Sequence, residues 1–305
     1  MSRFIQIVEV GPRDGLQNES RPLEVDEKLD FIRRLEACGV RRLEAVSFVN
    51  PRRVPQMAGA EEVMAGLAPG GASRIGLVLN RRGWDRAVAA GCDEANVVVC
   101  ASDGFGIRNQ GAPVAEQVAT MAEIAALRAQ TGGPELSLTI SVAFGCPFDG
   151  EVSEDQVVAI AREAAAAGIG EIALGDTIGV ADPWTVRQRI EAVRRAAPNA
   201  RLRMHFHNTR NTGLANTYAS VEAGVDVLDA SCGGIGGCPF APAATGNIAT
   251  EDLVYMLERA GFETGLNLDG LIKTGKWIGE RLGKEAASAL TRAGTFPPRA
   301  ILHDG

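Results

Sequence analysis

The chain has 305 residues, of which 46% are hydrophobic and 23% are charged, and it contains 36 glycines and 14 prolines. This composition is ordinary for a folded α/β protein and excludes disordered and fibrous classes. The net charge of −7 gives no electrostatic basis for binding nucleic acid, so a polyphosphate ligand would need a local group of lysines or arginines.

Cysteine usage and hydropathy indicate the compartment. The six cysteines have irregular spacing and form no Cys-x-x-Cys pair, which is typical of free thiols in a reducing environment. The first strand-like segment begins at Phe4, which leaves no room for a targeting segment ahead of it. No apolar run reaches the roughly 18 residues of a membrane span. We therefore expect a cytoplasmic protein with neither nucleic-acid nor membrane partners.

Short β-branched runs alternate along the chain with longer segments of helical period. The expected strands are Ile5–Glu9, Arg42–Val46, Arg74–Leu79, Ala95–Ala101, Leu136–Ala143, Glu171–Leu174, Arg201–His205 and Val227–Ser231. The expected helices include Val25–Ala37, Ala115–Ala129, Glu154–Ala167, Trp184–Ala196, Thr212–Ala223, Thr250–Ala260 and Leu268–Arg281.

Strict alternation of strand and helix indicates a parallel sheet covered by helices. Eight such units in about 230 residues favour a closed (β/α)8 TIM barrel with additional C-terminal helices. The alternative is an open, doubly wound sheet. We expect one domain over residues 1–305, with the barrel at about 4–245 and a helical extension at about 247–305.

Polar residues concentrate where the expected strands end, which is where barrel enzymes place their sites. The first strand leads into Gly11–Gly15, and the sixth into Gly175–Thr177. The seventh ends in His205-Phe206-His207, and the eighth leads into the glycine-rich segment Gly233–Gly237. These segments together predict an active site.

The His205-x-His207 pair indicates a metal site, because residues two apart on a strand face the same way. The alternative is two buried histidines that only form hydrogen bonds. Asp14 is the natural anionic ligand, and Asn247 offers an amide oxygen. Nitrogen and hard oxygen ligands without a thiolate suit Mg²⁺ or Mn²⁺, with Co²⁺ and Zn²⁺ as further options.

Arg13 precedes Asp14, and we expect both side chains to face the site because Gly11-Pro12 should end the strand. A guanidinium beside a metal can stabilise a developing oxyanion. The alternative is an arginine paired structurally with Glu44 or Asp176. Those two carboxylates fit roles as positioning groups or as bases.

The glycine-rich segment fits neither dinucleotide-binding nor Walker motifs, so nucleotide binding is not expected. A flap over the active site is the better interpretation. Cys238 follows this segment directly. It is either a small buried side chain or a thiol that gives a proton to a carbanion.

Several motifs resemble those of the 3-hydroxy-3-methylglutaryl-CoA lyase family, over a span from the first strand to about Gly265. The matching segments are Glu9–Glu19, Glu44, Ser47–Val49, Val54–Met57, Gly145–Pro147, Leu174–Gly179, Gly236–Pro239, Gly246–Asn247 and Ala249–Val254. The resemblance implies cleavage of a 3-hydroxyacyl-CoA into acetyl-CoA and a keto acid, and a homodimer. It also implies acetoacetate as the keto acid for the namesake substrate.

The same resemblance assigns roles to individual residues. It implies that Asp14, His205, His207 and Asn247 bind the metal. Arg13 would hold the thioester oxygen as an enolate forms, and Cys238 would protonate the carbanion. Glu44 and Asp176 would give catalytic support. Apart from the resemblance, we expect Gln17, Asn208 and Arg210 to contact the substrate; Arg210 lies in the segment that leaves the seventh strand, where barrel loops reach the site.

One segment departs from the family pattern. After His207 the family usually continues Asp-Thr-Tyr-Gly, whereas this chain has Asn208-Thr209-Arg210-Asn211. A different branched or more acidic substrate, such as citramalyl-CoA, is therefore an alternative to 3-hydroxy-3-methylglutaryl-CoA. The sequence is also compatible with a condensing synthase or oxo-acid aldolase of the same superfamily, and with a metal-stabilised binding barrel without activity.

Overall fold

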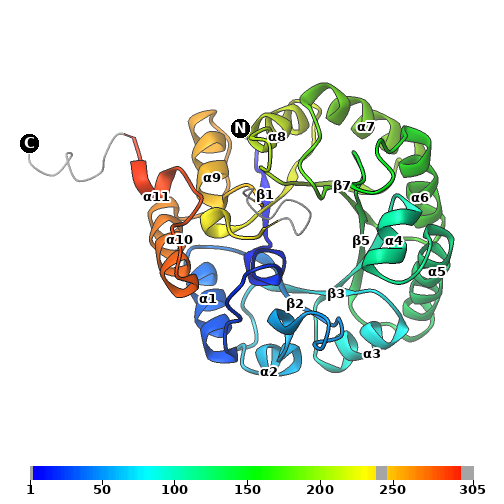
Figure 1. Cartoon of the computed structure of the whole chain (residues 1–305), viewed down its shortest axis with the longest axis horizontal. Coiled ribbons are helices and arrows are strands. Elements are labelled where there is room, and N and C mark those ends of the chain that lie inside the picture. The colour runs from blue at the N-terminus through cyan, green and yellow to red at the C-terminus, as the bar shows by residue number, and fades with distance from the viewer. Residues whose placement is uncertain (1–2, 238–245, 297–305) are drawn as a thin grey trace, which may run out of the picture.

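Eight parallel strands close into a barrel in the order in which they occur along the chain (Figure 1). The computed structural model describes residues 3–237 and 246–296. The strands are β1 (Gln6–Glu9), β2 (Arg42–Ser47), β3 (Ser73–Val78), β4 (Glu94–Cys100), β5 (Glu135–Ser141), β6 (Glu171–Asp176), β7 (Arg201–Phe206) and β8 (Val227–Ala230). The predicted TIM barrel is confirmed, and the open-sheet alternative is wrong.

Burial on both faces explains why these strands are apolar runs instead of alternating ones. In β4, for example, all seven residues are buried. Closure requires the first and last strands to pair, and Gln6 lies opposite Val227 in that pair. All eight predicted strands are present, and most of their predicted bounds differ from the structure by one or two residues. For example, β6 extends to Asp176 and β7 to Phe206.

Helices surround the barrel as an outer ring (Figure 1). They are α1 (Val25–Ala37), α2 (Ala60–Ala65), α3 (Arg81–Ala89), α4 (Asp103–Asn109), α5 (Val114–Thr131), α6 (Glu154–Ala166), α7 (Pro183–Ala196), α8 (Gly213–Glu222), α9 (Thr250–Arg259), α10 (Leu268–Leu282) and α11 (Leu290–Ala293). Three single turns accompany them: η1 (Gly11–Gly15), η2 (Pro55–Met57) and η3 (Cys232–Gly234).

The bounds of α1 agree with the prediction, and local signals explain both ends. Glu24 and Glu27 form a reciprocal capping box at its start. Gly39 follows its end with φ of +94°, and a Cβ there would lie 2.7 Å from the carbonyl oxygen of Gly265. Glycine is therefore required both by the backbone conformation and by the close approach of the chain.

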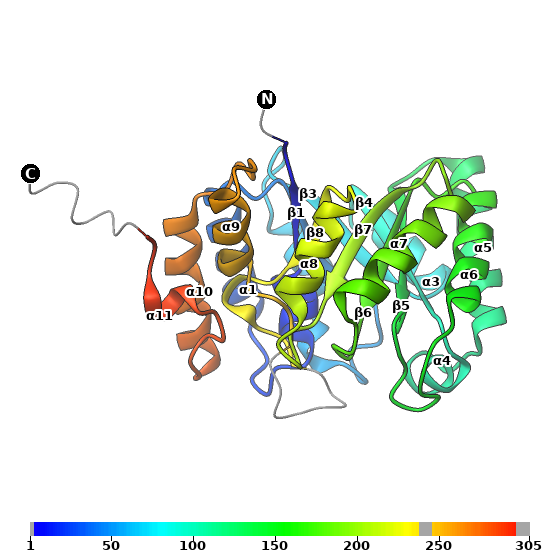
Figure 2. The same cartoon turned by 90° about the horizontal axis from the view of Figure 1, so that it is seen from above.

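The C-terminal helices lie beside the start of the barrel, where α10 packs against both α1 and α9 (Figures 1 and 2). Within the described ranges, no helix is both long enough and apolar enough to cross a membrane. The five described cysteines are buried and free, as predicted.

Candidate metal centre and active site

Asp14, His205 and His207 converge at the carboxyl ends of β1 and β7. Oδ2 of Asp14 lies 3.5 Å from Nε2 of His207 and 3.9 Å from Nε2 of His205. One ligand atom from each residue lies within 4.8 Å of the others. The two imidazoles therefore face one carboxylate, as the His-x-His spacing predicts.

Asp229 on β8 sets the orientation of His205. Its Oδ2 lies 3.2 Å from Nδ1 of His205, and both side chains are buried. A carboxylate at Nδ1 favours the tautomer with a proton there, which leaves the lone pair of Nε2 facing Asp14. Sequence reasoning missed Asp229, although a single acidic residue within an otherwise apolar strand could have identified it.

Asn247 lies against the same carboxylate. Its side-chain amide donates from Nδ2 to Oδ2 of Asp14 at 2.8 Å, and its backbone pairs with that of His207. The fourth expected ligand is thus brought to the other three. Since the nitrogen and oxygen of an amide are assigned by their hydrogen bonds, a cation at Asp14 would favour the orientation that presents the oxygen.

Arg13 and Asp14 both line the site because η1 follows directly after β1. The guanidinium of Arg13 donates from Nε to Oε2 of Glu44 at 2.7 Å and from Nη1 to Oδ1 of Asp14 at 2.7 Å. Burial alone would raise the pKa of Asp14, but Arg13 and the two histidines lower it well below its ordinary range. The two alternatives for Arg13 therefore occur together. Its guanidinium pairs with Glu44, and it also faces Asp14 in the site.

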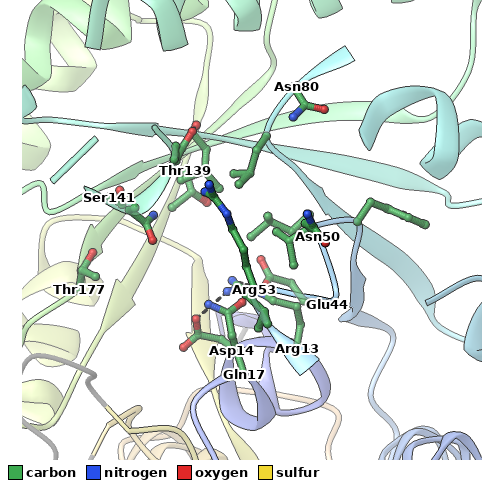
Figure 3. A pocket seen from close by; sticks show the side chains of 18 of the residues that line it. Arg13, Asp14, Gln17, Glu44, Asn50, Arg53, Asn80, Thr139, Ser141 and Thr177 are labelled. Carbon is green, nitrogen blue, oxygen red and sulfur yellow. Dashed lines mark hydrogen bonds and ion pairs between the residues drawn. The ribbon is translucent and has the colours of Figure 1, made fainter. Parts of the chain in front are cut away.

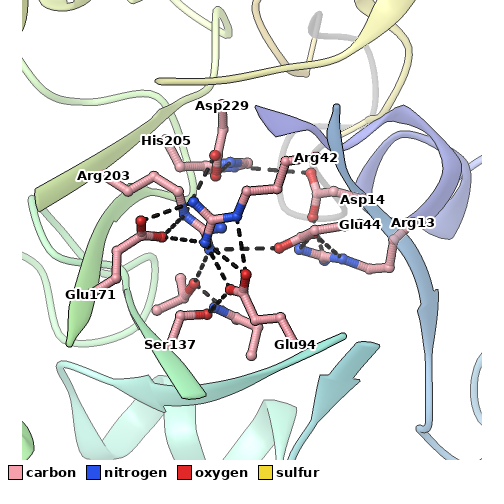
Figure 4. Close-up of polar contacts among 12 residues, drawn as sticks. Arg13, Asp14, Arg42, Glu44, Glu94, Ser137, Glu171, Arg203, His205 and Asp229 are labelled. Atoms are coloured by element: carbon pink, nitrogen blue, oxygen red, sulfur yellow. Dashed lines mark hydrogen bonds and ion pairs between the residues drawn. The ribbon is translucent and has the colours of Figure 1, made fainter. Parts of the chain in front are cut away.

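Arg203, a buried arginine on β7, lies between the residues around His205 and those around Arg13 (Figure 4). Arg203 is fully buried and lies 3.5 Å from Asp229 and 3.8 Å from Glu44. It also lies 3.6 Å from Glu171, which pairs with Arg42 at the amino-terminal end of the strands. Since Asp229 contacts His205 and Glu44 contacts Arg13, Arg203 lies between the partners of the candidate ligand His205 and of Arg13. Sequence reasoning did not identify it.

Asp176 ends β6 and holds the loop that follows. Its two carboxylate oxygens accept from the backbone nitrogens of Val180 and Ala181, at 2.8 and 3.1 Å. Burial raises the pKa of Asp176. Its neighbours Gly175 and Thr177 line the cavity described below, whereas Asp176 does not.

Two buried glutamates hold the glycine-rich segment in place. Glu9 accepts from the backbone nitrogens of Gly11 and Cys232, and Glu251 accepts from that of Gly233. Burial raises the pKa of Glu9 to about 7 and that of Glu251 to about 8. Glu9 therefore connects η1 with η3, and Glu251 connects η3 with α9.

Gly236 explains why this segment needs glycine. Its φ is +109°, and a Cβ there would lie 2.7 Å from Nδ2 of Asn247 and 3.1 Å from Cα of Gly15. The segment therefore lies directly against Asn247 and the backbone of η1. Cys238, the predicted proton donor, lies outside the described residues. Cys232 is fully buried on η3, and burial raises the pKa of its thiol well above the ordinary value.

A cavity of about 1290 Å³ opens above these residues (Figure 3). Arg13, Asp14, Glu44, His205 and His207 are among the residues that line it. Gln17, an expected substrate contact, lines it as well. The predicted metal ligands and catalytic arginine therefore share one cavity.

The other two expected substrate contacts lie elsewhere. Arg210 is exposed and donates from Nη1 to the carbonyl oxygens of Ile178 and Gly179, at 2.8 and 3.0 Å. Asn208 accepts from the backbone nitrogen of Gly213 at the start of α8. Neither side chain is among those that line the cavity.

Comparison with known proteins agrees with this geometry. The model of the family described as HMGL-like matches residues 4–278. The chain belongs to the HMGL-like family. It is 42% identical to the (R)-citramalyl-CoA lyase of Chloroflexus aurantiacus, over 97% of each chain.

Solved structures extend the likeness to the fold. The hydroxymethylglutaryl-CoA lyase of Pseudomonas aeruginosa superposes with a TM-score of 0.91 at 40% identity, covering 96% of this chain and 98% of that one. An HMG-CoA lyase of Acinetobacter baumannii, in complex with coenzyme A and 3-methylmalate, gives 0.91 at 38% identity and covers 96% of each chain. This HMGL-like protein is therefore a carbon–carbon lyase with a TIM-barrel fold.

Proposed function

We propose that this HMGL-like protein cleaves a 3-hydroxyacyl-CoA into acetyl-CoA and a keto acid with the help of a divalent metal. The observation that carries the proposal is the convergence of Asp14, His205 and His207 beside Arg13 in one cavity. A non-enzymatic binding barrel would need no arginine at the metal site. The lyase names of the relatives favour cleavage over condensation.

The residues present suit a hard or borderline divalent ion. Asp14, His205, His207 and Asn247 would hold it, and Asp229 keeps Nε2 of His205 facing the site. Mg²⁺ or Mn²⁺ fits this donor set best, with Co²⁺ and Zn²⁺ as further options. When bound, the ion acts as a Lewis acid that acidifies the 3-hydroxyl group of the substrate.

The protein's own groups would then handle the proton and the electron pair. The hydroxyl proton passes to a carboxylate of the site. Of the two supporting carboxylates, Glu44 lines the cavity and Asp176 does not. The bond between C2 and C3 breaks as the ketone forms. Arg13 holds the thioester oxygen as its enolate develops, and Glu44 fixes the direction of the guanidinium. Cys238 protonates the carbanion at C2.

We propose 3-hydroxy-3-methylglutaryl-CoA as the substrate and citramalyl-CoA as the second candidate. The first rests on the motifs from Glu9 to Val254. The second rests on the (R)-citramalyl-CoA lyase relative and on the departure at residues 208–211.

A substrate screen tests the proposal. The purified protein is mixed with Mg²⁺ or Mn²⁺ and with each candidate thioester, and acetyl-CoA is measured by mass spectrometry. We expect acetyl-CoA together with acetoacetate from the first substrate, or with pyruvate from the second. Consumption of acetyl-CoA with a keto acid, and no release from any thioester, would instead identify a condensing synthase.

A further inference from the structure

The charged residues that line the cavity differ in burial. The acidic ones among the described residues are Asp14, Glu44 and Asp229, which are half-buried or buried and lie around the candidate metal centre. Four arginines on the segments that follow β2 and β3 also line the cavity: Arg52, Arg53, Arg82 and Arg86. Arg52, Arg53 and Arg82 are exposed. One cavity therefore contains a group of carboxylates with little exposure and a group of exposed cations.

Three of these four arginines have guanidinium groups without a hydrogen-bond or ion-pair partner among the described residues, and Arg86 is the exception. Arg86 forms an ion pair with Glu61 and donates to the carbonyl oxygen of Phe48. The side chains of Arg52, Arg53 and Arg82 are exposed and form no hydrogen bond or ion pair with any described residue. In a chain with a net charge of −7, three neighbouring cations without acidic partners indicate a site for an anion.

Two ordered turns hold these arginines at the cavity. Asn50 accepts from the backbone nitrogen of Arg52 with its side chain, at 3.0 Å, and from that of Arg53 with its carbonyl oxygen, at 2.9 Å. The side chain of Asn80 accepts from the backbone nitrogen of Gly83 and caps α3, the helix that carries Arg82. Figure 3 shows the Arg53 side chain reaching into the cavity from its turn.

Apolar side chains line the same cavity. They include Phe48, Leu77, Leu79, Val98 and Phe105. The cavity thus combines candidate metal ligands, apolar side chains and exposed cations. An acyl-CoA combines the matching kinds of group: an oxygen-rich acyl head, a long pantetheine arm and a phosphorylated nucleotide.

We propose that Arg52, Arg53 and Arg82 bind the phosphates of the CoA substrate, an inference that rests on the proposed function. A guanidinium matches phosphate geometry with two parallel hydrogen bonds. The three cations would offset part of the charge of the diphosphate and the 3′-phosphate. The pantetheine arm would then lie against the apolar side chains of the same cavity.

The test compares a CoA thioester with the pantetheine thioester of the same acyl group, which lacks the diphosphate and the nucleotide. The variant replaces all three arginines with alanine. Its control is Arg81→Ala, an adjacent exposed arginine on α3 that pairs with Asp85 and does not line the cavity. Steady-state kinetics use whichever thioester the wild-type protein cleaves faster, and thermal unfolding checks that each variant folds.

We expect the triple variant to raise KM for the CoA thioester about 10-fold or more, with little change in kcat. The preference for the CoA thioester over the pantetheine thioester should fall by the same factor and should become less sensitive to salt. Arg81→Ala should keep the wild-type preference. Equal losses for both thioesters would overturn the proposal, because they would place the arginines at the acyl group. An unchanged preference would overturn it as well.

Binding of free CoA, measured without turnover, tests this inference separately from the proposed function. If the wild-type protein cleaves no thioester, the proposed function fails, but calorimetry with CoA and with dephospho-CoA still tests the arginines. We expect the triple variant to bind CoA about 10-fold more weakly than the wild-type protein does. Equal affinity of the two proteins for CoA would overturn the phosphate site even if the lyase reaction is confirmed.

Discussion

Nδ1 of His205 lies 3.2 Å from Oδ2 of Asp229, and this contact leaves Nε2 of the imidazole facing Asp14. Asp229 lies on β8, and His205 lies on the neighbouring strand β7. Such a carboxylate fixes the tautomer of a metal-binding histidine and raises the basicity of its other nitrogen. The proposed metal centre therefore depends on Asp229, which is not itself one of the candidate ligands.

We expect Asp229→Ala to weaken metal binding about 10- to 100-fold, because His205 loses its orienting partner. Asp229→Asn keeps an oxygen that accepts from Nδ1, so its loss should be smaller. Metal affinity is measured by calorimetry on the metal-free protein, and activity should recover at high metal concentration. Wild-type affinity in the alanine variant would show that Asp229 only balances the charge of Arg203.

Cys238→Ser replaces a thiol, with an ordinary pKa near 8.5, by a far weaker acid of similar size. We expect kcat to fall on the order of 100-fold while metal content stays normal. Cys232→Ser is the matched control, since that thiol is fully buried and donates to the carbonyl oxygen of Leu271. It should lower stability more than kcat. Equal losses of kcat in the two variants would argue for packing and against proton transfer.

Arg210 tests how the departure at residues 208–211 affects the substrate. Its guanidinium donates to the carbonyl oxygens of Ile178 and Gly179 and does not line the cavity. We expect Arg210→Tyr to lower kcat/KM for both candidate thioesters by a similar factor, because the loop after β6 loses an anchor. The measurement is the ratio of the two kcat/KM values. A change of about tenfold in this ratio, equal to about 1.4 kcal/mol, would instead assign Arg210 to substrate binding.

Glu251 makes stability depend on pH. Burial raises its pKa to about 8 in the folded protein, whereas an unfolded glutamate titrates near 4.5. Between these values the folded state holds a proton that the unfolded state has lost, so the free energy of unfolding falls as pH rises. The contribution of this carboxyl is fully present below about pH 4.5 and is lost as pH rises to about 8.

Glu251→Gln removes the titrating group and keeps an oxygen for the backbone nitrogen of Gly233. We expect the free energy of unfolding of the variant, relative to the wild-type protein, to rise on the order of 2–4 kcal/mol between pH 5 and pH 9. Denaturant unfolding at several pH values measures this difference. A difference that is independent of pH would show that Glu251 is ionised throughout.

Much of the fold follows from local patterns in the sequence. The bounds of α1 agree with the prediction because its capping box and Gly39 are local signals. His205 and His207 were identified because residues two apart on a strand share a face. The glycine and proline at positions 11 and 12 correctly predicted that Arg13 and Asp14 both reach the site.

The remaining features depend on contacts between distant segments. Asp229 and Arg203 lie within strands, and only the pairing of β7 with β8 brings them together. The carbonyl partners of Arg210 lie on the loop after β6, more than 30 residues earlier in the chain. The shared cavity of Arg53 and Arg82 likewise requires the loops after β2 and β3 to be placed in space.

Metal-dependent product release is the most direct test of the proposed lyase. The wild-type protein is freed of metal with a chelator, supplied again with Mg²⁺ or Mn²⁺, and assayed for acetyl-CoA release by mass spectrometry. His207→Ala is treated in the same way, with His303→Ala, at the chain's third histidine, as the control. We expect release by the wild-type protein and the control only after metal is restored, and a sharp loss of both bound metal and release in His207→Ala. Release at the wild-type rate from the chelated protein, or from His207→Ala with normal metal content, would contradict a metal centre at Asp14, His205 and His207.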